Sequence, residues 1–211
     1  MPTSHSGQIN TIVDLLTIIN PKKLLDIGVG HGKYGFLARE YLDISDNSKP
    51  YSTRTVQIDG IEAFPEYITD LQRLIYDTIH IGNALDVIDK VDNYDLILMM
   101  DVFEHFTYED GMALLNKCLK HSKHVLISCP RNVEPQGAEY GNIYETHRFE
   151  WRKKHFRSYK EKAFIPNYYS LICLLGPGAK QVRRKFLGDN MKLRIGSMFP
   201  RIRRLYIRMK G

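Results

Sequence analysis

The chain has 211 residues, of which 43% are hydrophobic and 26% charged, and its formal net charge is +6. This composition is that of a soluble globular protein and excludes a largely disordered chain, and no apolar run approaches the roughly 18 residues of a membrane-spanning helix. The three cysteines lack CxxC spacing and the N-terminus lacks a secretory pattern, so we expect no disulfide framework and a cytoplasmic location.

Helices and strands alternate in the first half of the chain. Apolar residues at helical spacing predict a helix over residues 8–19, and Asn20 with Pro21 ends it. The apolar run at 23–27 stops at a glycine cluster and is typical of a buried parallel strand. The elements expected next are a helix at 33–42, a loop at 45–53, a strand at 55–61, a helix at 65–76 and a strand at 78–81.

The second half continues this alternation. Thr107 and Asp110 fit a capping arrangement for a helix that runs to about residue 120. The other expected elements are strands at 94–100, 123–128, 163–165 and 168–175, a long loop at 131–144 and a helix at 149–155. Short strands that alternate with helices imply an α/β fold with a parallel sheet and right-handed crossovers.

A glycine-rich turn follows the first strand, in the sequence LLDIGVGHGKYG (residues 24–35). Gly28, Gly30 and Gly32 let the backbone turn tightly and let a ligand approach it closely. Such a turn also occurs in ordinary strand–helix connections. Its spacing departs from GxGxxG and from the phosphate-binding GxxxxGK[ST] pattern, which disfavours a dehydrogenase and a P-loop nucleotidase.

Polar residues follow three further strands at the points where those strands end. Glu62 ends the second strand, Asn83 and Ala84 follow the third, and Asp101 follows the fourth. Because the carboxyl ends of parallel strands share one edge of the sheet, these residues are expected to lie together where α/β folds bind ligands. A carboxylate at the end of the second strand can accept hydrogen bonds from both hydroxyls of a ribose.

Over residues 8–175 the chain resembles the class I S-adenosylmethionine (SAM)-dependent methyltransferases. The segments that carry the resemblance are LLDIGVGHGKYG, GIEAFPEYI, GNALDV and DLILMMDVFEHF. The resemblance implies a Rossmann-like three-layer sandwich with a mostly parallel seven-stranded sheet and an antiparallel last strand. It also implies SAM as the cofactor, a methyltransferase domain at residues 1–178 and an extension at 179–211.

The resemblance assigns the cofactor contacts by position within these motifs. The residues implied are Asp26, Gly28, Gly30, Gly32, Glu62, Asn83, Ala84 and Asp101. The first four would face the amino-acid part of SAM, and Glu62 would hold the ribose. Asn83 and Ala84 would contact the adenine, and Asp101 would lie at the methionine side. The family commonly has Asp where this chain has Asn83, whose amide oxygen can still accept from an exocyclic amine.

Methyl transfer to a neutral hydroxyl needs a base, and histidine suits this role because its pKa lies near working pH. His105 follows the fourth strand and His147 lies beyond the fifth, so both are candidate catalytic residues. The structural alternatives are support of the loop for His105 and, for His147, burial against Trp151 or a surface position. His31 is expected to shape the glycine-rich turn. No paired His/Asp spacing on one helix face suggests a metal, so none is expected.

The acceptor pocket is expected from residues 130–150 and the first helix. Arg131 and Arg148 can hold a carboxylate or phosphate of the acceptor or form salt bridges, and Tyr140 and Tyr144 can supply aromatic walls. The motif at Asp101 lacks the Asn/Asp-Pro-Pro-aromatic pattern of nucleobase and glutamine amine methylation. The favoured function is therefore methyl transfer to a small-molecule or glycan-type acceptor at oxygen.

The C-terminal extension is strongly basic, with eleven Lys and Arg residues and one acid between Lys180 and Lys210. From Ile195 its apolar residues recur at helical spacing, which predicts a basic amphipathic helix. This helix can pack on the core of the chain, lie on an anionic membrane surface as a peripheral anchor, or bind RNA. The alternative functions are an RNA or protein methyltransferase recruited by this tail and a non-catalytic adenosyl-binding scaffold.

Overall fold

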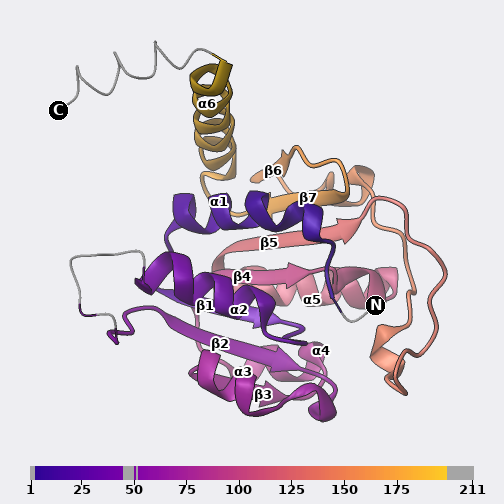
Figure 1. Cartoon of the computed structure of the whole chain (residues 1–211). Helices are drawn as coiled ribbons and strands as arrows, with labels where there is room; N and C mark the ends of the chain where they lie inside the picture. The colour runs from indigo at the N-terminus through magenta and orange to yellow at the C-terminus, as the bar shows by residue number, and fades with distance from the viewer. Residues whose placement is uncertain (1–2, 45–49, 51, 199–211) are drawn as a thin grey trace.

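A computed structural model describes residues 3–44, 50 and 52–198 of the chain, with side chains in the last helix described as far as Met191. Its centre is one seven-stranded sheet with the strand order β3-β2-β1-β4-β5-β7-β6 (Figure 1). The strands are β1 (Lys23–Ile27), β2 (Gln57–Glu62), β3 (Thr78–Ile81), β4 (Tyr94–Met100), β5 (Ser122–Pro130), β6 (Lys162–Ile165) and β7 (Ser170–Leu175).

The first five strands are parallel to one another, and β7 pairs antiparallel with both β5 and β6. The helices are α1 (Ile9–Ile19), α2 (Lys33–Ala38), α3 (Asp70–Ile75), α4 (Ala84–Val87), α5 (Tyr108–His121) and α6 (Ala179–Met198). The expected fold is confirmed, including the seven strands and the antiparallel direction of the last one.

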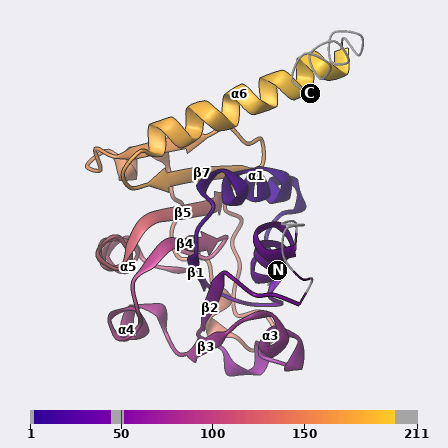
Figure 2. The same cartoon turned by 90° about the vertical axis from the view of Figure 1, so that its left-hand side faces the viewer.

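Helices cover both faces of the sheet because its strands are apolar on both sides (Figures 1 and 2). Leu24 and Leu96 point into a core layer shared with α1, α2, α3 and α6. The next residues along these strands, Leu25 and Ile97, point into the opposite layer with α4 and α5. All four side chains are fully buried. The alternation of side chains along each strand thus builds the three-layer sandwich.

Three of the expected helices differ from the sequence prediction. The helix expected at 65–76 is interrupted, with a 3-10 turn at Pro65–Tyr67 and α3 beginning only at Asp70, because Thr69 caps it together with Gln72. The helix expected at 33–42 continues after Ala38 as a π-helix, Arg39–Ile44. The helix expected at 149–155 is a short 3-10 helix, Lys153–Phe156.

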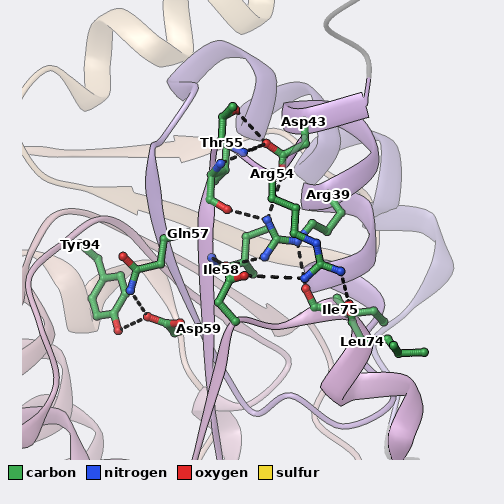
Figure 3. A network of polar contacts seen from close by, with 12 residues as sticks. Arg39, Asp43, Arg54, Thr55, Gln57, Ile58, Asp59, Leu74, Ile75 and Tyr94 are labelled. Atoms are coloured by element: carbon green, nitrogen blue, oxygen red, sulfur yellow. Dashed lines mark hydrogen bonds and ion pairs between the residues drawn. The ribbon is translucent and has the colours of Figure 1, made fainter. Parts of the chain in front are cut away.

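Arg39 begins the π-helix and is the centre of a network of polar contacts (Figure 3). Its buried guanidinium donates to Asp43 at 2.8 Å, within the π-helix, and to the carbonyl oxygens of Val56 and Ile75. It also pairs with Asp77. These contacts join the π-helix to the residues before β2 and after α3, so a single side chain holds together segments distant in the sequence. Its paired carboxylates offset the cost of burying the cation.

Helix α6 begins at Ala179, and its first half packs on the body of the molecule. Ala179 and Phe186 are buried in the same layer as α1, and Figure 2 shows the helix continuing beyond the sheet. Most of the apolar series predicted from Ile195 onward, and much of the loop expected at 45–53, fall outside the described residues. The division at residue 178 stays a prediction. Among the described helices, none is long and apolar enough to cross a bilayer.

Candidate functional site

The glycine-rich turn after β1 is held close to the end of β2. The amide of Gly28 donates to the carbonyl oxygen of Ile61 at 2.8 Å. Gly28 has a φ of +82° and Gly30 a φ of +50°, a backbone region that side chains disfavour. A Cβ atom at Gly28 would lie 2.3 Å from a methyl carbon of Val102. Glycine is therefore required there by both conformation and space.

A cavity of about 240 Å³ opens at the carboxyl edge of the parallel strands, in front of this turn. The sequence-predicted residues that line it are Gly28, Gly30, Glu62, Asn83, Ala84, Asp101 and His105. They come from the ends of β1, β2, β3 and β4, which the register of the sheet brings to one level. Asp26, Gly32 and His147 do not line the cavity.

The Glu62 carboxylate is fixed by two backbone amides. One oxygen accepts from Gly30 at 2.9 Å, and the other accepts from Phe64 at 2.9 Å. Burial raises the pKa of Glu62, while these two hydrogen bonds act in the opposite direction. The side chain thus links the glycine-rich turn to β2 and lines the cavity between them.

Asp101 has a φ of +55°, unusual for a residue other than glycine, and its carboxylate accepts from three donors in two segments of the chain. It accepts from the amide of His5 at 3.1 Å, from Gln8 Nε2 at 2.9 Å and from Ser128 Oγ at 3.0 Å. Burial raises the pKa of Asp101, and the nearby Lys33 cation partly offsets this. The segment before α1 is thereby fastened to the end of β4, beside the cavity.

Asn83 combines two roles at the third strand end. Its side-chain oxygen accepts from the amide of Leu85 at 3.0 Å and so caps α4. It lines the cavity together with the buried Ala84. Since the oxygen of Asn83 already caps α4, the amide nitrogen of Asn83 is the side-chain group left to contact a ligand.

Asp26 lies behind the glycine-rich turn and is 2% exposed. One of its carboxylate oxygens accepts from the hydroxyl of Tyr76 at 2.6 Å, and that hydroxyl accepts from the amide of Gly35. Burial raises the pKa of Asp26 to about 7, and the nearby Glu62 charge adds to this. Its expected contact with the cofactor stays a prediction, as does that of Gly32.

The raised pKa of Asp26 predicts a pH-dependent stability. Between about pH 4 and pH 7 the folded carboxyl keeps a proton that the unfolded chain has lost, so the free energy of unfolding falls as pH rises through this window. The full effect is about 4 kcal/mol. We expect Asp26→Asn, which cannot ionise, to flatten this dependence in urea unfolding at pH 5 and pH 8. The exposed Asp86→Asn serves as control. If the free energy of unfolding of Asp26→Asn still falls between pH 5 and pH 8 as it does in the unchanged protein, Asp26 is not the group responsible.

Two distant segments meet next to the cavity. After β4 the chain forms a one-turn 3-10 helix, Phe103–His105. The amides of Arg148 and Phe149 both donate to the carbonyl oxygen of Glu104, at 2.8 and 3.2 Å. The rings of His105 and His147 therefore lie with their centroids 5.1 Å apart. The two predicted catalytic histidines are neighbours, and His105 lines the cavity.

Both histidines are oriented by backbone carbonyl groups. Nδ1 of His105 lies 3.3 Å from the carbonyl oxygen of Thr146, and Nδ1 of His147 lies 2.5 Å from that of Glu134. Since a carbonyl only accepts, Nδ1 is assigned a proton in each ring. Burial lowers the pKa of His105 to about 4, so its ring is neutral at pH 7.

Some cavity residues were missed by sequence reasoning. Those residues are Thr3, Ser4, Tyr67, Asn142 and Glu145. The expected contribution of the first helix comes instead from the segment before it. Of the expected acceptor residues, Tyr144 and Arg148 line the cavity, whereas Arg131 donates to the carbonyl oxygen of Asn167 elsewhere. Tyr140 is 76% exposed. No local spacing signals these contacts, because the residues come from segments far apart in the sequence that meet only in the folded chain.

No protein-family model and no curated protein matches the sequence. Solved structures do match the fold. The N-terminal domain of EvdMO1 was solved with S-adenosylhomocysteine (SAH), the product of SAM, and D-fucose. It has a TM-score of 0.58 and 9% identity, over 82% of this chain and 84% of that one. The methyltransferase domain of bacterial CtHen1 has a TM-score of 0.54 and 19% identity, over 81% and 98%.

A third similar structure is the mitomycin 7-O-methyltransferase MmcR, with a TM-score of 0.52 and 13% identity. The match covers 79% of this chain but only 53% of MmcR. At these identities the likeness concerns the fold. The chain has the Rossmann-like fold of the class I SAM-dependent methyltransferases, as its sequence motifs predicted.

Proposed function

We propose that this protein is a SAM-dependent methyltransferase that transfers a methyl group to a hydroxyl oxygen of a small-molecule or glycan-type acceptor. The observation that carries the proposal is the convergence of the glycine-rich turn, Glu62, Asn83, Ala84 and Asp101 on one cavity. This is the edge at which open α/β sheets bind nucleoside ligands.

The residues present fit an adenosyl ligand. The missing Cβ of Gly28 leaves the wall of the cavity as bare backbone, because a side chain there would collide with Val102. Glu62 lies within the same wall and would accept the hydrogen bonds of the ribose hydroxyls, while Asn83 and Ala84 would contact the adenine. Asp101 would lie at the methionine end. Asp26 and Gly32 would support this part of the cavity from behind the turn.

SAM supplies a methyl group that its sulfonium has already activated. The protein would align the acceptor with that methyl and keep water out. Tyr144 and Arg148 line the cavity beside His105 and would position the acceptor. His105 and His147 would act on its hydroxyl, because an imidazole nitrogen can accept a proton or bind a cation.

The choice of acceptor class is supported by the similar structures. One was solved with D-fucose, and another is described as a 7-O-methyltransferase. The proposal can be tested by incubating the purified chain with methyl-labelled SAM and pools of hydroxylated sugars and small molecules. The label is expected in an alkali-stable methyl ether of a small compound. Labelled RNA or protein would contradict the acceptor class, and SAM binding without transfer to any pool would favour the scaffold alternative.

A basic groove favours a second candidate, an RNA or protein methyltransferase recruited through residues 180–211. The groove lies between β6 and the first half of α6, apart from the donor cavity. Its cationic residues are Arg131, Lys153, Lys162, Lys180, Arg183 and Arg184. No Asp or Glu is among the described residues that line it. Such a surface suits RNA or an anionic membrane, the latter giving a cytoplasmic protein a peripheral membrane location.

Charge reversal in the basic groove tests this recruitment. The double variant Lys180→Glu/Arg184→Glu is expected to weaken binding to single-stranded RNA or to phosphatidylserine vesicles by about 10- to 100-fold at low salt, since each surface cation contributes about 1 kcal/mol. Binding measured at rising salt should fall in the unchanged protein. The matched control, Lys22→Glu/Lys90→Glu, changes the net charge equally outside the groove. If both double variants lose the same amount of RNA or vesicle binding, the basic groove is not a specific binding surface.

A further inference from the structure

One cluster of side chains beside the donor cavity has the composition of a metal site. Glu104, His105 and His147 each offer one ligand atom, and these atoms lie within 4.8 Å of one another. We propose that the three side chains bind one divalent cation and that this cation holds the acceptor hydroxyl. The proposal rests on the proposed function and deepens it.

The Glu104 carboxyl group supports this assignment because one of its two oxygens lacks a partner among the described residues. Glu104 is 1% exposed, and its Oε2 atom has no hydrogen-bond partner among the described residues. The backbone carbonyl of Glu104 is used by the amides of Arg148 and Phe149, but these bonds do not satisfy the side chain. A buried carboxylate oxygen without a donor is costly, and a cation shared with two imidazoles would compensate it.

The two histidines are already oriented as metal ligands. Their Nδ1 atoms lie within hydrogen-bond distance of the carbonyl oxygens of Thr146 and Glu134, so the Nε2 atoms are the ones that would coordinate the cation. Metal-binding histidines typically donate the other ring N–H to a carbonyl or carboxylate in this way, which fixes the tautomer and the ring direction. The two anchoring carbonyls lie on the 131–149 segment, which also supplies His147.

The cluster is held by a rigid support. The indole nitrogen of Trp151 donates to the carbonyl oxygen of Phe103 at 2.7 Å, and the two rings pack with centroids 4.2 Å apart. Together with the bonds to the Glu104 carbonyl, this contact fixes the 147–151 segment against the residues after β4. The ligand atoms are thus brought together by the fold rather than by sequence spacing, which is why the sequence predicted no metal.

The ligand chemistry selects the kind of cation. Two imidazole nitrogens and one carboxylate oxygen suit first-row divalent ions such as Mn²⁺, Co²⁺ or Zn²⁺ better than Mg²⁺ or Ca²⁺, which prefer oxygen ligands alone. Three protein ligands leave coordination positions open. Because His105 also lines the donor cavity, the open side faces the place where the acceptor would lie.

This arrangement would activate the hydroxyl without a histidine base. Coordination lowers the pKa of the bound hydroxyl, which releases its proton to water. The oxygen then forms a bond to the methyl carbon while the carbon–sulfur bond breaks, and the bonding electron pair goes to sulfur. The products are the methyl ether, neutral S-adenosylhomocysteine (SAH) and one proton. His105 and His147 act here as ligands rather than as proton acceptors.

The test measures metal binding directly. The full chain is stripped of metal with EDTA and titrated with Mn²⁺, and the free Mn²⁺ is followed by electron paramagnetic resonance. In a second experiment the stripped chain is dialysed against Zn²⁺, and its Zn²⁺ content is measured. One ion per chain is expected. Glu104→Gln and His147→Ala are each expected to weaken binding at least 10-fold, by analogy with the loss seen when groups around metal ligands are changed. His80→Asn, outside the cluster, serves as the matched control.

Thermal unfolding of each variant shows whether it folds, and Glu104→Gln keeps the shape of the side chain. Failure of the unchanged chain to bind either ion, or equal binding by all variants, would overturn the proposal. SAH binding to the stripped protein separates the two hypotheses. If SAH binds but no cation does, only the metal site fails; if a cation binds but SAH does not, the proposed function fails while the metal site stands.

Discussion

Replacement of Glu62 by alanine is expected to weaken SAH binding at least 100-fold in isothermal titration. The carboxylate of Glu62 would accept the two ribose hydroxyls, and hydrogen bonds to a charged group contribute about 1.5–3 kcal/mol each. The same carboxylate holds the amides of Gly30 and Phe64, so alanine also releases the glycine-rich turn. Both consequences weaken SAH binding.

Glu62→Gln separates these two consequences. The amide keeps one acceptor oxygen but loses the charge, so we expect an intermediate loss of about 10-fold. The exposed Glu66, in the turn that follows β2, does not line the cavity, and Glu66→Gln should bind SAH normally. Circular dichroism and the melting temperature verify that each variant is folded. If Glu62→Ala binds SAH as tightly as the unchanged protein, Glu62 does not hold the ribose.

Trp151→Ala is expected to lower the free energy of unfolding by about 3–5 kcal/mol. Trp151 is 1% exposed and packs against Phe103 and Phe156. Its indole also fills the space beside Gly111, where a Cβ would lie 2.4 Å from the ring. Truncation would leave a large cavity and remove the hydrogen bond to the carbonyl of Phe103. The loss is measured by urea unfolding followed by circular dichroism. Tryptophan fluorescence is unsuitable because Trp151 is the only tryptophan of the chain.

The conservative variant Trp151→Phe tests whether the role is packing alone. It keeps most of the apolar volume but loses the indole N–H, so we expect a loss of about 1–2 kcal/mol. Trp151 also holds the 147–151 segment in place, and its truncation should therefore reduce methyl transfer more than it reduces SAH binding. An unfolding free energy that stays within 1 kcal/mol of the unchanged protein for Trp151→Ala would contradict this account of the core.

The fold and the grouping of Gly28, Gly30, Glu62, Asn83 and Asp101 around one cavity could be predicted from local sequence patterns. The glycine-rich turn, Glu62, Asn83 and Asp101 each directly follow or end a strand, and parallel strands bring their carboxyl ends to one edge. A short-range pattern combined with one topological rule was therefore sufficient. The strands were predicted well because their apolar runs are bounded by glycine, proline or polar residues.

The side of the cavity proposed for the acceptor could not be predicted in this way, because long-range contacts build it. His147 reaches His105 through backbone hydrogen bonds between Glu104 and residues 148–149. The cavity wall before α1 depends on the donors that His5 and Gln8 supply to Asp101. None of these partners is marked by periodicity or spacing. The interrupted helix at 65–76 has a local cause, the capping pair of Thr69 and Gln72, whose effect the apolar spacing of this segment does not reveal.

A crystal structure of the full chain grown with SAH would show where the cofactor product binds. We predict one SAH molecule in the cavity at the carboxyl edge of the sheet. Its ribose hydroxyls should lie against the Glu62 carboxylate, its adenine beside Asn83 and Ala84, and its homocysteine portion towards Asp101. Density for SAH at another place, or crystals that exclude SAH while NAD occupies this cavity, would contradict this prediction.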